Sequence, residues 1–126
     1  MPKSKRSPYV LKPRLRVLRG GTIVLGPGKV DLLEAIAETG ELRRAARRLA
    51  MSYMRAWTLI QTMNDAFGRP LVSTERGGAA HGTARLTPLG RRALALYREM
   101  ERKSTTASRP AFRRLLRLVA RSPRNI

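Results

Sequence analysis

The sequence has little of what catalysis and metal binding require. Its 126 residues include no cysteine, one histidine and eight acidic residues. They offer no nucleophile with an adjacent base, no cluster of metal ligands and no glycine-rich loop of the kind that cradles phosphates. We therefore expect a protein that is not an enzyme and that uses neither a metal nor a cofactor.

Long apolar runs are also missing. No stretch approaches the ~20 apolar residues of a membrane-spanning helix. The first residues, MPKSKRSPYVLKP, lack the apolar centre of a signal peptide. We expect a cytoplasmic protein without a membrane partner, and the length gives room for one domain.

Negative charge is scarce, and positive charge is concentrated toward the two ends. The sequence holds 27 Lys and Arg, and its formal net charge is +19. Residues 1–26 contain seven basic and no acidic residues, residues 27–90 nine and six, and residues 91–126 eleven and two. This balance favours a polyanion as the partner, because flanking cations attract phosphates whatever the base sequence.

Residues 40–68 have the pattern of two helices joined by a tight turn. Apolar residues at helical spacing give each helix one buried side. These positions are Leu42, Ala45, Ala46 and Leu49, then Ala56, Ile60, Met63 and Phe67. Ala50 to Ser52 form the corner, and the Ser52 hydroxyl suits an N-cap. Such a helix-turn-helix predicts binding to double-stranded DNA.

The start of the second helix and its surroundings supply the candidate DNA contacts. A recognition helix reads bases with its first turns, and Arg55 is best placed to bridge the two acceptors of a guanine. Ser52 and Tyr53 suit phosphate oxygens near the positive end of the helix dipole. The complete set of candidates is Arg43, Arg44, Arg47, Ser52, Tyr53, Met54, Arg55, Trp57, Thr58, Arg76, His81 and Arg85.

Three of these residues also have a plain structural interpretation. Trp57, the only tryptophan, either packs in the core under the wing or contacts DNA. Arg55 is either a base contact or a solvated arginine, and His81 is either a wing contact or a solvated loop residue. The sequence leaves these alternatives open.

The pattern changes period after Gly68. Residues 70–75 and 83–87 predict two short strands around the segment ERGGAAHG, whose glycines permit a loose hairpin tip. A hairpin directly after a helix-turn-helix is a wing. Arg76, His81 and Arg85 are expected at or near its tip, within reach of a phosphate or the minor groove.

Further elements are predicted on both sides of this centre. Residues 15–18 and 22–25 flank a Gly-Gly pair and predict a β-hairpin. One helix is expected at residues 29–38 and another from residue 88 to about Lys103. Their inward positions are Val30, Leu33, Ile36 and Ala37 in the first, and Leu89, Ala93, Leu96, Tyr97 and Met100 in the second.

These patterns together predict a mainly α fold with a small β wing: a winged helix-turn-helix with an N-terminal β-hairpin and a long C-terminal helix. We expect a basic flexible arm at 1–13, the DNA-binding domain at 14–103, and a basic tail at 104–126. Within that tail, residues 110–121 predict a separate amphipathic helix. It suits packing on a partner subunit or gripping phosphates, and an anionic membrane surface is the alternative.

The run GPGKVDLLEAIAETGELRRAARRLAMSYMRAWTLIQTMNDAFGRPLV, followed by GG and ARLTPLG, resembles the DNA-binding domain of ModE-type molybdenum-dependent transcriptional regulators. More distantly, it resembles the winged domain of LysR-type regulators. The resemblance covers residues 15–103 and is most specific at MSYMRAW and its spacing to LTPLG. It implies a winged helix-turn-helix that dimerises and reads an operator, with Ser52, Tyr53 and Arg55 at the family's serine-tyrosine-basic start.

Three features depart from that family. Glu41 stands where serine is usual, and the wing tip has fewer glycines. Full-length members also carry an oxyanion-binding domain, which we expect to be absent from this chain. Molybdate sensing is therefore not carried over.

The expected function is sequence-specific transcriptional regulation by a homodimer on an inverted repeat, because one recognition helix reads only a few base pairs. The helices at 29–38 and 89–103 are expected to pair, with ion pairs across the interface. These would join Asp31, Glu34 and Glu38 to Arg91, Arg92, Arg98 and Arg102. The alternatives are a nonspecific nucleoid-associated DNA-binding protein and a basic RNA-binding or ribosomal protein.

Overall fold

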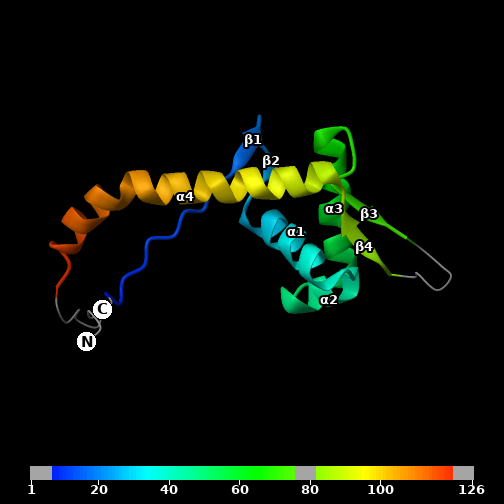
Figure 1. Cartoon of the computed structure of the whole chain (residues 1–126), viewed down its shortest axis with the longest axis horizontal. Coiled ribbons are helices and arrows are strands. Elements are labelled where there is room, and N and C mark those ends of the chain that lie inside the picture. Colours follow the sequence, from blue (N-terminus) through cyan, green and yellow to red (C-terminus); the bar gives the residue numbers. More distant parts are fainter. Residues whose placement is uncertain (1–6, 76–81, 121–126) are drawn as a thin grey trace.

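The computed structural model describes residues 7–75 and 82–120. In these parts of the chain, four helices and two small antiparallel sheets follow one another (Figure 1). The elements are β1 (Val17–Arg19), β2 (Thr22–Leu25), α1 (Pro27–Thr39), α2 (Leu42–Arg48), α3 (Tyr53–Phe67), β3 (Val72–Thr74), β4 (Ala84–Leu86) and α4 (Pro88–Leu116). The expected winged helix-turn-helix with an N-terminal hairpin and a long C-terminal helix is confirmed.

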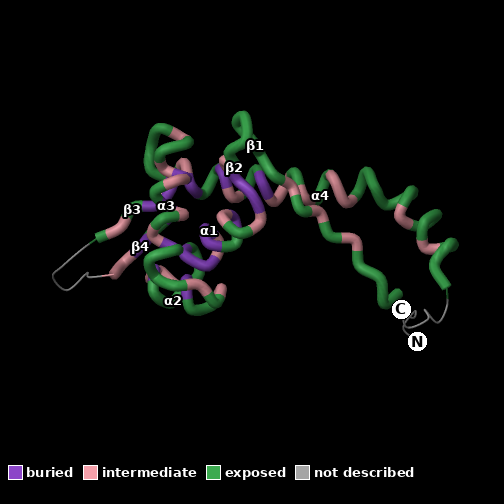
Figure 2. The backbone as a smooth tube through the Cα atoms, turned by 180° about the vertical axis from the view of Figure 1, so that it is seen from behind, coloured by how far each residue is buried: buried purple, intermediate pink, exposed green. Residues whose placement is uncertain are grey.

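Helix α1 lies at the centre of the hydrophobic core. It packs against α2, α3, α4 and β4, so more than one of its sides is covered (Figure 2). Val30, Leu33 and Ile36 are buried as expected, but Leu32 and Ala35 are buried as well. The prediction for Ala37 was wrong, since it is exposed. A single inward stripe describes a surface helix, whereas α1 is enclosed by its neighbours.

The corner between α2 and α3 forms as predicted. Ala50 adopts a left-handed conformation with φ of 55°, which lets the chain turn sharply. The amide of Met51 donates to the carbonyl of Ala46 at 3.0 Å. The Ser52 hydroxyl then accepts from the backbone amide of Arg55 at 3.0 Å and caps α3.

Asn64 joins the wing to α3, a role that the sequence analysis missed. Its side-chain carbonyl accepts from the backbone amide of Leu71 at 2.8 Å, and its amide group donates to the carbonyl of Val72 at 3.4 Å. At the base of the wing, the amide of Ala84 donates to the carbonyl of Gly40 at 3.0 Å. The wing is therefore fixed both to α3 and to the junction of α1 and α2.

The start of α4 is locked against the segment that follows α3. The Thr87 hydroxyl accepts from the amide of Gly90 at 3.0 Å and donates to the carbonyl of Pro70 at 2.7 Å. Gly90 is buried, and a Cβ on it would lie 2.0 Å from the carbonyl oxygen of Leu71. Only glycine permits this close approach of the helix to the neighbouring backbone.

Helix α4 is longer than the sequence predicted. It does not end near Lys103 but continues to Leu116, with Pro110 inside it, so residues 110–116 are its last turns and not the start of a separate helix. A proline deprives the carbonyl four residues earlier of its partner. That residue, Thr106, is exposed, so water can satisfy its carbonyl. Beyond the body of the molecule α4 projects freely (Figure 1).

Two apolar residues of α4 are also placed differently than expected. Ala93 and Tyr97 are buried, but Leu96 and Met100 are 54% and 42% exposed. The core ends before the helix does, so only one side of its first turns is covered.

The N-terminal segment runs beside α4 into the β1–β2 hairpin. Residues 7–16 contain neither helix nor strand, and the Tyr97 hydroxyl donates to the carbonyl of Leu15 at 2.7 Å. Burial raises the pKa of Tyr97 above its ordinary value, so it stays a hydroxyl donor. The hairpin forms in the predicted place, with Arg19 opposite Thr22 across the Gly-Gly turn.

The first prediction concerns Gly90. Gly90→Ala should lower the free energy of unfolding by at least about 1–3 kcal/mol, because the added methyl group meets a backbone carbonyl that cannot move alone. Gly28→Ala is the matched control, since Gly28 is also a helical glycine and a Cβ there meets nothing within 4 Å. Denaturant unfolding measures both variants. An equal or raised stability of Gly90→Ala would contradict the close approach.

The second prediction concerns the cap of α3. Ser52→Ala should cost about 1 kcal/mol of stability, because the amide of Arg55 loses its acceptor. Ser52→Asp should retain most of that stability, since aspartate is an equally good cap. Thermal unfolding of the two variants makes the comparison, and identical melting temperatures for Ser52→Ala and the wild type would rule the cap out.

Candidate nucleic-acid interface

The start of α3 presents an exposed surface. Ala56, Ile60 and Met63 turn its other side into the core. Five of the predicted contact residues are exposed at or just before its first turns: Ser52, Tyr53, Met54, Arg55 and Thr58. The structure therefore brings these candidates to one accessible end of the helix.

Helix α2 contributes arginines to the same surface. The guanidinium carbon of Arg43 lies 5.3 Å from the centre of the Tyr53 ring. This distance is typical of a cation–π contact, which holds the two side chains in register. The contact joins two predicted candidates from different helices, and no periodicity in the sequence announces it.

The remaining arginines of α2 differ in their ionic partners. Arg44 pairs with Glu41 at 3.2 Å, and Arg48 pairs with Glu38. Arg44 is still largely exposed, so it keeps donors for another partner. None of the ion pairs between described residues includes Arg43, Arg47, Arg55 or Arg85. The free guanidinium groups thus flank the start of α3.

Trp57 lies at the edge of this surface and not at its centre. It is half-buried and packs against the hydrophobic core. This position supports the core interpretation of Trp57 for most of its ring, while its exposed edge remains a predicted DNA contact.

The wing supplies one described candidate. Arg85 is exposed on β4, opposite Ser73 of β3. The other two wing candidates, Arg76 and His81, lie outside the described residues.

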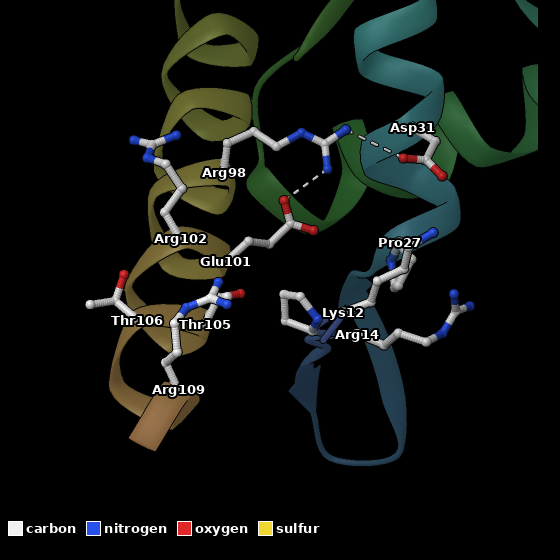
Figure 3. Close-up of a pocket in the computed structure, with 11 residues that line it drawn as sticks. Lys12, Arg14, Pro27, Asp31, Arg98, Glu101, Arg102, Thr105, Thr106 and Arg109 are labelled. Carbon is white, nitrogen blue, oxygen red and sulfur yellow. Dashed lines mark hydrogen bonds and ion pairs between the residues drawn. The ribbon is translucent and has the colours of Figure 1, made fainter. Parts of the chain in front are cut away.

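Arg98 binds acidic side chains of its own chain. Its guanidinium contacts Asp31 at 3.3 Å and Glu34 at 3.2 Å on α1, and Glu101 at 2.9 Å on α4 (Figure 3). Burial opposes its charge, but the hydrogen bonds to Glu101 and Glu34 keep the pKa of Arg98 above its ordinary value. The prediction that Arg98 meets Asp31 and Glu34 across a dimer interface was wrong. These pairs join α1 to α4 within one chain.

Glu38 is likewise used within the chain, since it pairs with Arg48 of α2. Its predicted place in a dimer interface was therefore also wrong.

An open hollow of about 610 Å³ lies beside the Arg98 cluster, between the N-terminal segment, α1 and α4 (Figure 3). Its charged lining is mixed: Lys12, Arg14, Arg98, Arg102, Arg109, Asp31 and Glu101. Two carboxylates among these cations make it a poorer anion site than its arginines alone suggest.

Two further features bear on the class of site. Among residues 7–75 and 82–120, no three side chains of the metal-ligating types lie together. In the same part of the chain, no helix is long and apolar enough to cross a membrane.

Comparison with known proteins identifies relatives of this arrangement. Residues 28–91 match the family described as bacterial regulatory helix-turn-helix protein, lysR family. The chain is 43% identical over 77 residues to the molybdenum transport protein ModE of Azotobacter vinelandii, which covers 61% of this chain and 28% of that protein. It is 42% identical over 77 residues to the molybdenum-pterin-binding protein MopB of Rhodobacter capsulatus, with the same coverage of 61% and 28%. The chain thus spans less than a third of the length of these relatives.

Solved structures show the same architecture. The complex of the CbnR DNA-binding domain with DNA is 29% identical, with a TM-score of 0.52, and the match covers 67% of this chain and 94% of that one. ArgP from Mycobacterium tuberculosis shares the fold at 22% identity and a TM-score of 0.52, over 68% of this chain and 30% of that one. The family match covers the helix-turn-helix, both strands of the wing and the start of α4. The chain therefore belongs to the lysR family of bacterial regulatory helix-turn-helix proteins.

Proposed function

We propose that this chain is a transcriptional regulator that binds duplex DNA in a sequence-specific manner, as a homodimer on an inverted repeat. The observation that carries the proposal is the capped start of α3, which presents Tyr53, Met54 and Arg55 to solvent beside uncompensated arginines. An α-helix with such an end fits the major groove of B-DNA. Action on bacterial DNA implies the cytoplasm as its location.

The side chains at this end divide into two roles. Arg55 is proposed to read a guanine, because a guanidinium can donate to both acceptors of its major-groove edge. The Ser52 hydroxyl accepts from the amide of Arg55, so its own hydrogen is free to donate to a phosphate. Arg43, Arg47 and Arg85 are proposed to contact phosphates, which fix the register of the helix without reading sequence.

Helix α4 adds attraction that does not depend on sequence. Its projecting part exposes four arginines in a region without carboxylates: Arg109, Arg113, Arg114 and Arg117. Cations of this kind raise affinity for any duplex and make it fall with salt. The names of the matched relatives refer to molybdenum, and we propose that only DNA binding is shared, because the match covers 28% of their length.

The proposed dimer uses an apolar stripe on α4. Leu96 and Met100 are exposed one turn apart, and Ala107, Ala111 and Leu115 continue the same side of the helix. A second copy of α4 would cover this stripe and relate two α3 helices by a twofold axis. The expected operator then has half-sites about one or two helical turns apart.

Selection from a random duplex library, followed by genome-wide mapping of bound sites, tests the function. A regulator enriches one inverted repeat and gives sharp peaks at matching sites. A broad distribution without an enriched motif would instead indicate a nonspecific DNA organiser. Tighter binding to structured RNA than to the selected duplex at the same salt would overturn the proposal.

The third prediction concerns base reading by Arg55. Arg55→Ala should lose about 1–3 kcal/mol of binding free energy on the selected site and much less on random duplex. Arg92→Ala is a matched control, because Arg92 is an equally exposed arginine on α4 with no proposed DNA contact. Fluorescence anisotropy on both duplexes gives the difference. If Arg55→Ala weakened both by the same factor, Arg55 would be a phosphate contact.

The fourth prediction concerns the dimer. The double variant Leu96→Gln, Met100→Gln should shift the chain toward monomer, because it places polar groups on the stripe that the second copy covers. Ala95→Gln changes an exposed residue off that stripe and should leave the dimer intact. Light scattering at micromolar concentration distinguishes the two states. A monomeric wild type whose DNA footprint lacks dyad symmetry would refute the dimer.

A further inference from the structure

The β1–β2 hairpin lies on the opposite side of α3 from the wing. In both views α3 stands between the hairpin and strands β3 and β4 (Figures 1 and 2). Residues of the hairpin and of α3 line shared hollows along the helix, while Asn64 ties the other side of α3 to the wing. The proposed reading helix is therefore flanked by two hairpins, and only the β3–β4 hairpin has so far been given a role.

A groove separates the hairpin from the start of α3. It has a volume of about 490 Å³, and its walls come from the hairpin, the first turn of α1 and the first turns of α3. Four cationic residues line it: Arg14, Arg16, Lys29 and Arg55. No carboxylate is among its lining residues, in contrast to the hollow beside Arg98, which contains Asp31 and Glu101. Its charge is thus uniformly positive.

The hairpin is held in place at this groove. Lys29 of α1 donates to the carbonyl of Ile23 in β2 at 2.5 Å, and the Tyr97 hydroxyl holds the carbonyl of Leu15 just before β1. The partial burial that accompanies the first contact lowers the pKa of Lys29. These contacts fix both strands to the helical body, so the groove keeps its width without a ligand.

Arg14 and Arg16 are free to meet a partner from this anchored frame. Both are exposed, and none of the ion pairs between described residues includes either of them. The stem of Arg16 lies close to Gly26, so that its γ-carbon would be 3.6 Å from a Cβ at that position. A stem that packs on the backbone leaves the guanidinium at the rim.

We propose that this groove binds the sugar-phosphate strand that borders the DNA groove entered by α3, so that the N-terminal hairpin acts as a second wing. The inference rests on the proposed function, since Arg55 faces the bases from the same hollow. Guanidinium groups suit phosphate oxygens because they donate in a planar fork. Arg14 and Arg16 would hold one strand while the β3–β4 wing holds the chain on the other side.

The fifth prediction tests this arrangement with the double variant Arg14→Gln, Arg16→Gln in the full chain. The slope of log affinity against log salt should flatten by about 0.9 for each phosphate that the variant no longer binds, on selected and random duplex alike. At 0.15 M salt that slope corresponds to a decrease of about fivefold in affinity per phosphate. Ethylation interference should disappear at one cluster of phosphates and persist elsewhere.

Controls separate this proposal from charge removal and from misfolding. Arg92→Gln removes the same charge from α4 and should leave the ethylation pattern unchanged. Arg14→Lys with Arg16→Lys keeps the charge and should restore most of the salt slope. If the Gln variant melts below the wild type, the single variant Arg16→Gln is measured in its place.

The outcomes distinguish the second wing from the function itself. An unchanged slope and ethylation pattern in the Gln variant, while Arg55→Ala still loses the selected site, would overturn the second wing and leave the regulator standing. Failure of the wild type to prefer any duplex would overturn the function. Loss of preference for the selected site without a change of slope would show that the hairpin reads bases, and this too would overturn the phosphate groove.

Discussion

The backbone of Leu71 is the joint on which the arrangement of the helices depends. Its amide is held by the Asn64 side chain of α3, and its carbonyl accepts from the amide of Thr87 at 2.9 Å. The same carbonyl lies against Gly90, where a Cβ would be 2.0 Å away. One buried residue thus connects the end of α3, the first strand of the wing and the start of α4. None of the three can shift without breaking a hydrogen bond in a buried place, where an unsatisfied group costs about 1–3 kcal/mol.

Charge is distributed so that the carboxylates are used inside the chain. In the described residues, six of the eight are in ion pairs: Asp31, Glu34, Glu38, Glu41, Glu99 and Glu101. Exposed pairs stabilise a fold by only about 0–1 kcal/mol each. Their larger effect is on the electrostatic field, because a paired carboxylate repels a phosphate less than a free one. The cations without such partners lie on α2, on α3 and around the hairpin groove, where a polyanion is attracted most strongly.

The sequence predicted the parts of the fold that local patterns determine. Helical spacing, the Ser52 and Thr87 caps and the glycine-rich turns located every helix start and both hairpins correctly. Contacts between distant residues were not predictable in this way: Asn64 reads as an ordinary helix residue, and Arg98 has acidic neighbours on α1 only after folding. The length of α4 was missed because an exposed helix tolerates Pro110, although a proline usually marks a helix boundary. The place of Arg55 beside a uniformly basic groove likewise depends on the anchored hairpin.

A continuous α4 has a consequence for how two copies read DNA together. The helix begins at the Leu71 joint and carries the exposed pair Leu96 and Met100 about 15 Å further along, at 1.5 Å per residue from Gly90 to Met100. Between joint and stripe, Arg98 clamps α4 to α1 through Asp31 and Glu34. No flexible linker separates the proposed dimer contact from α3 in this part of the chain. The spacing of two reading helices would therefore be fixed by rigid packing, so operators with altered half-site spacing would be rejected because the protein cannot bend to follow them.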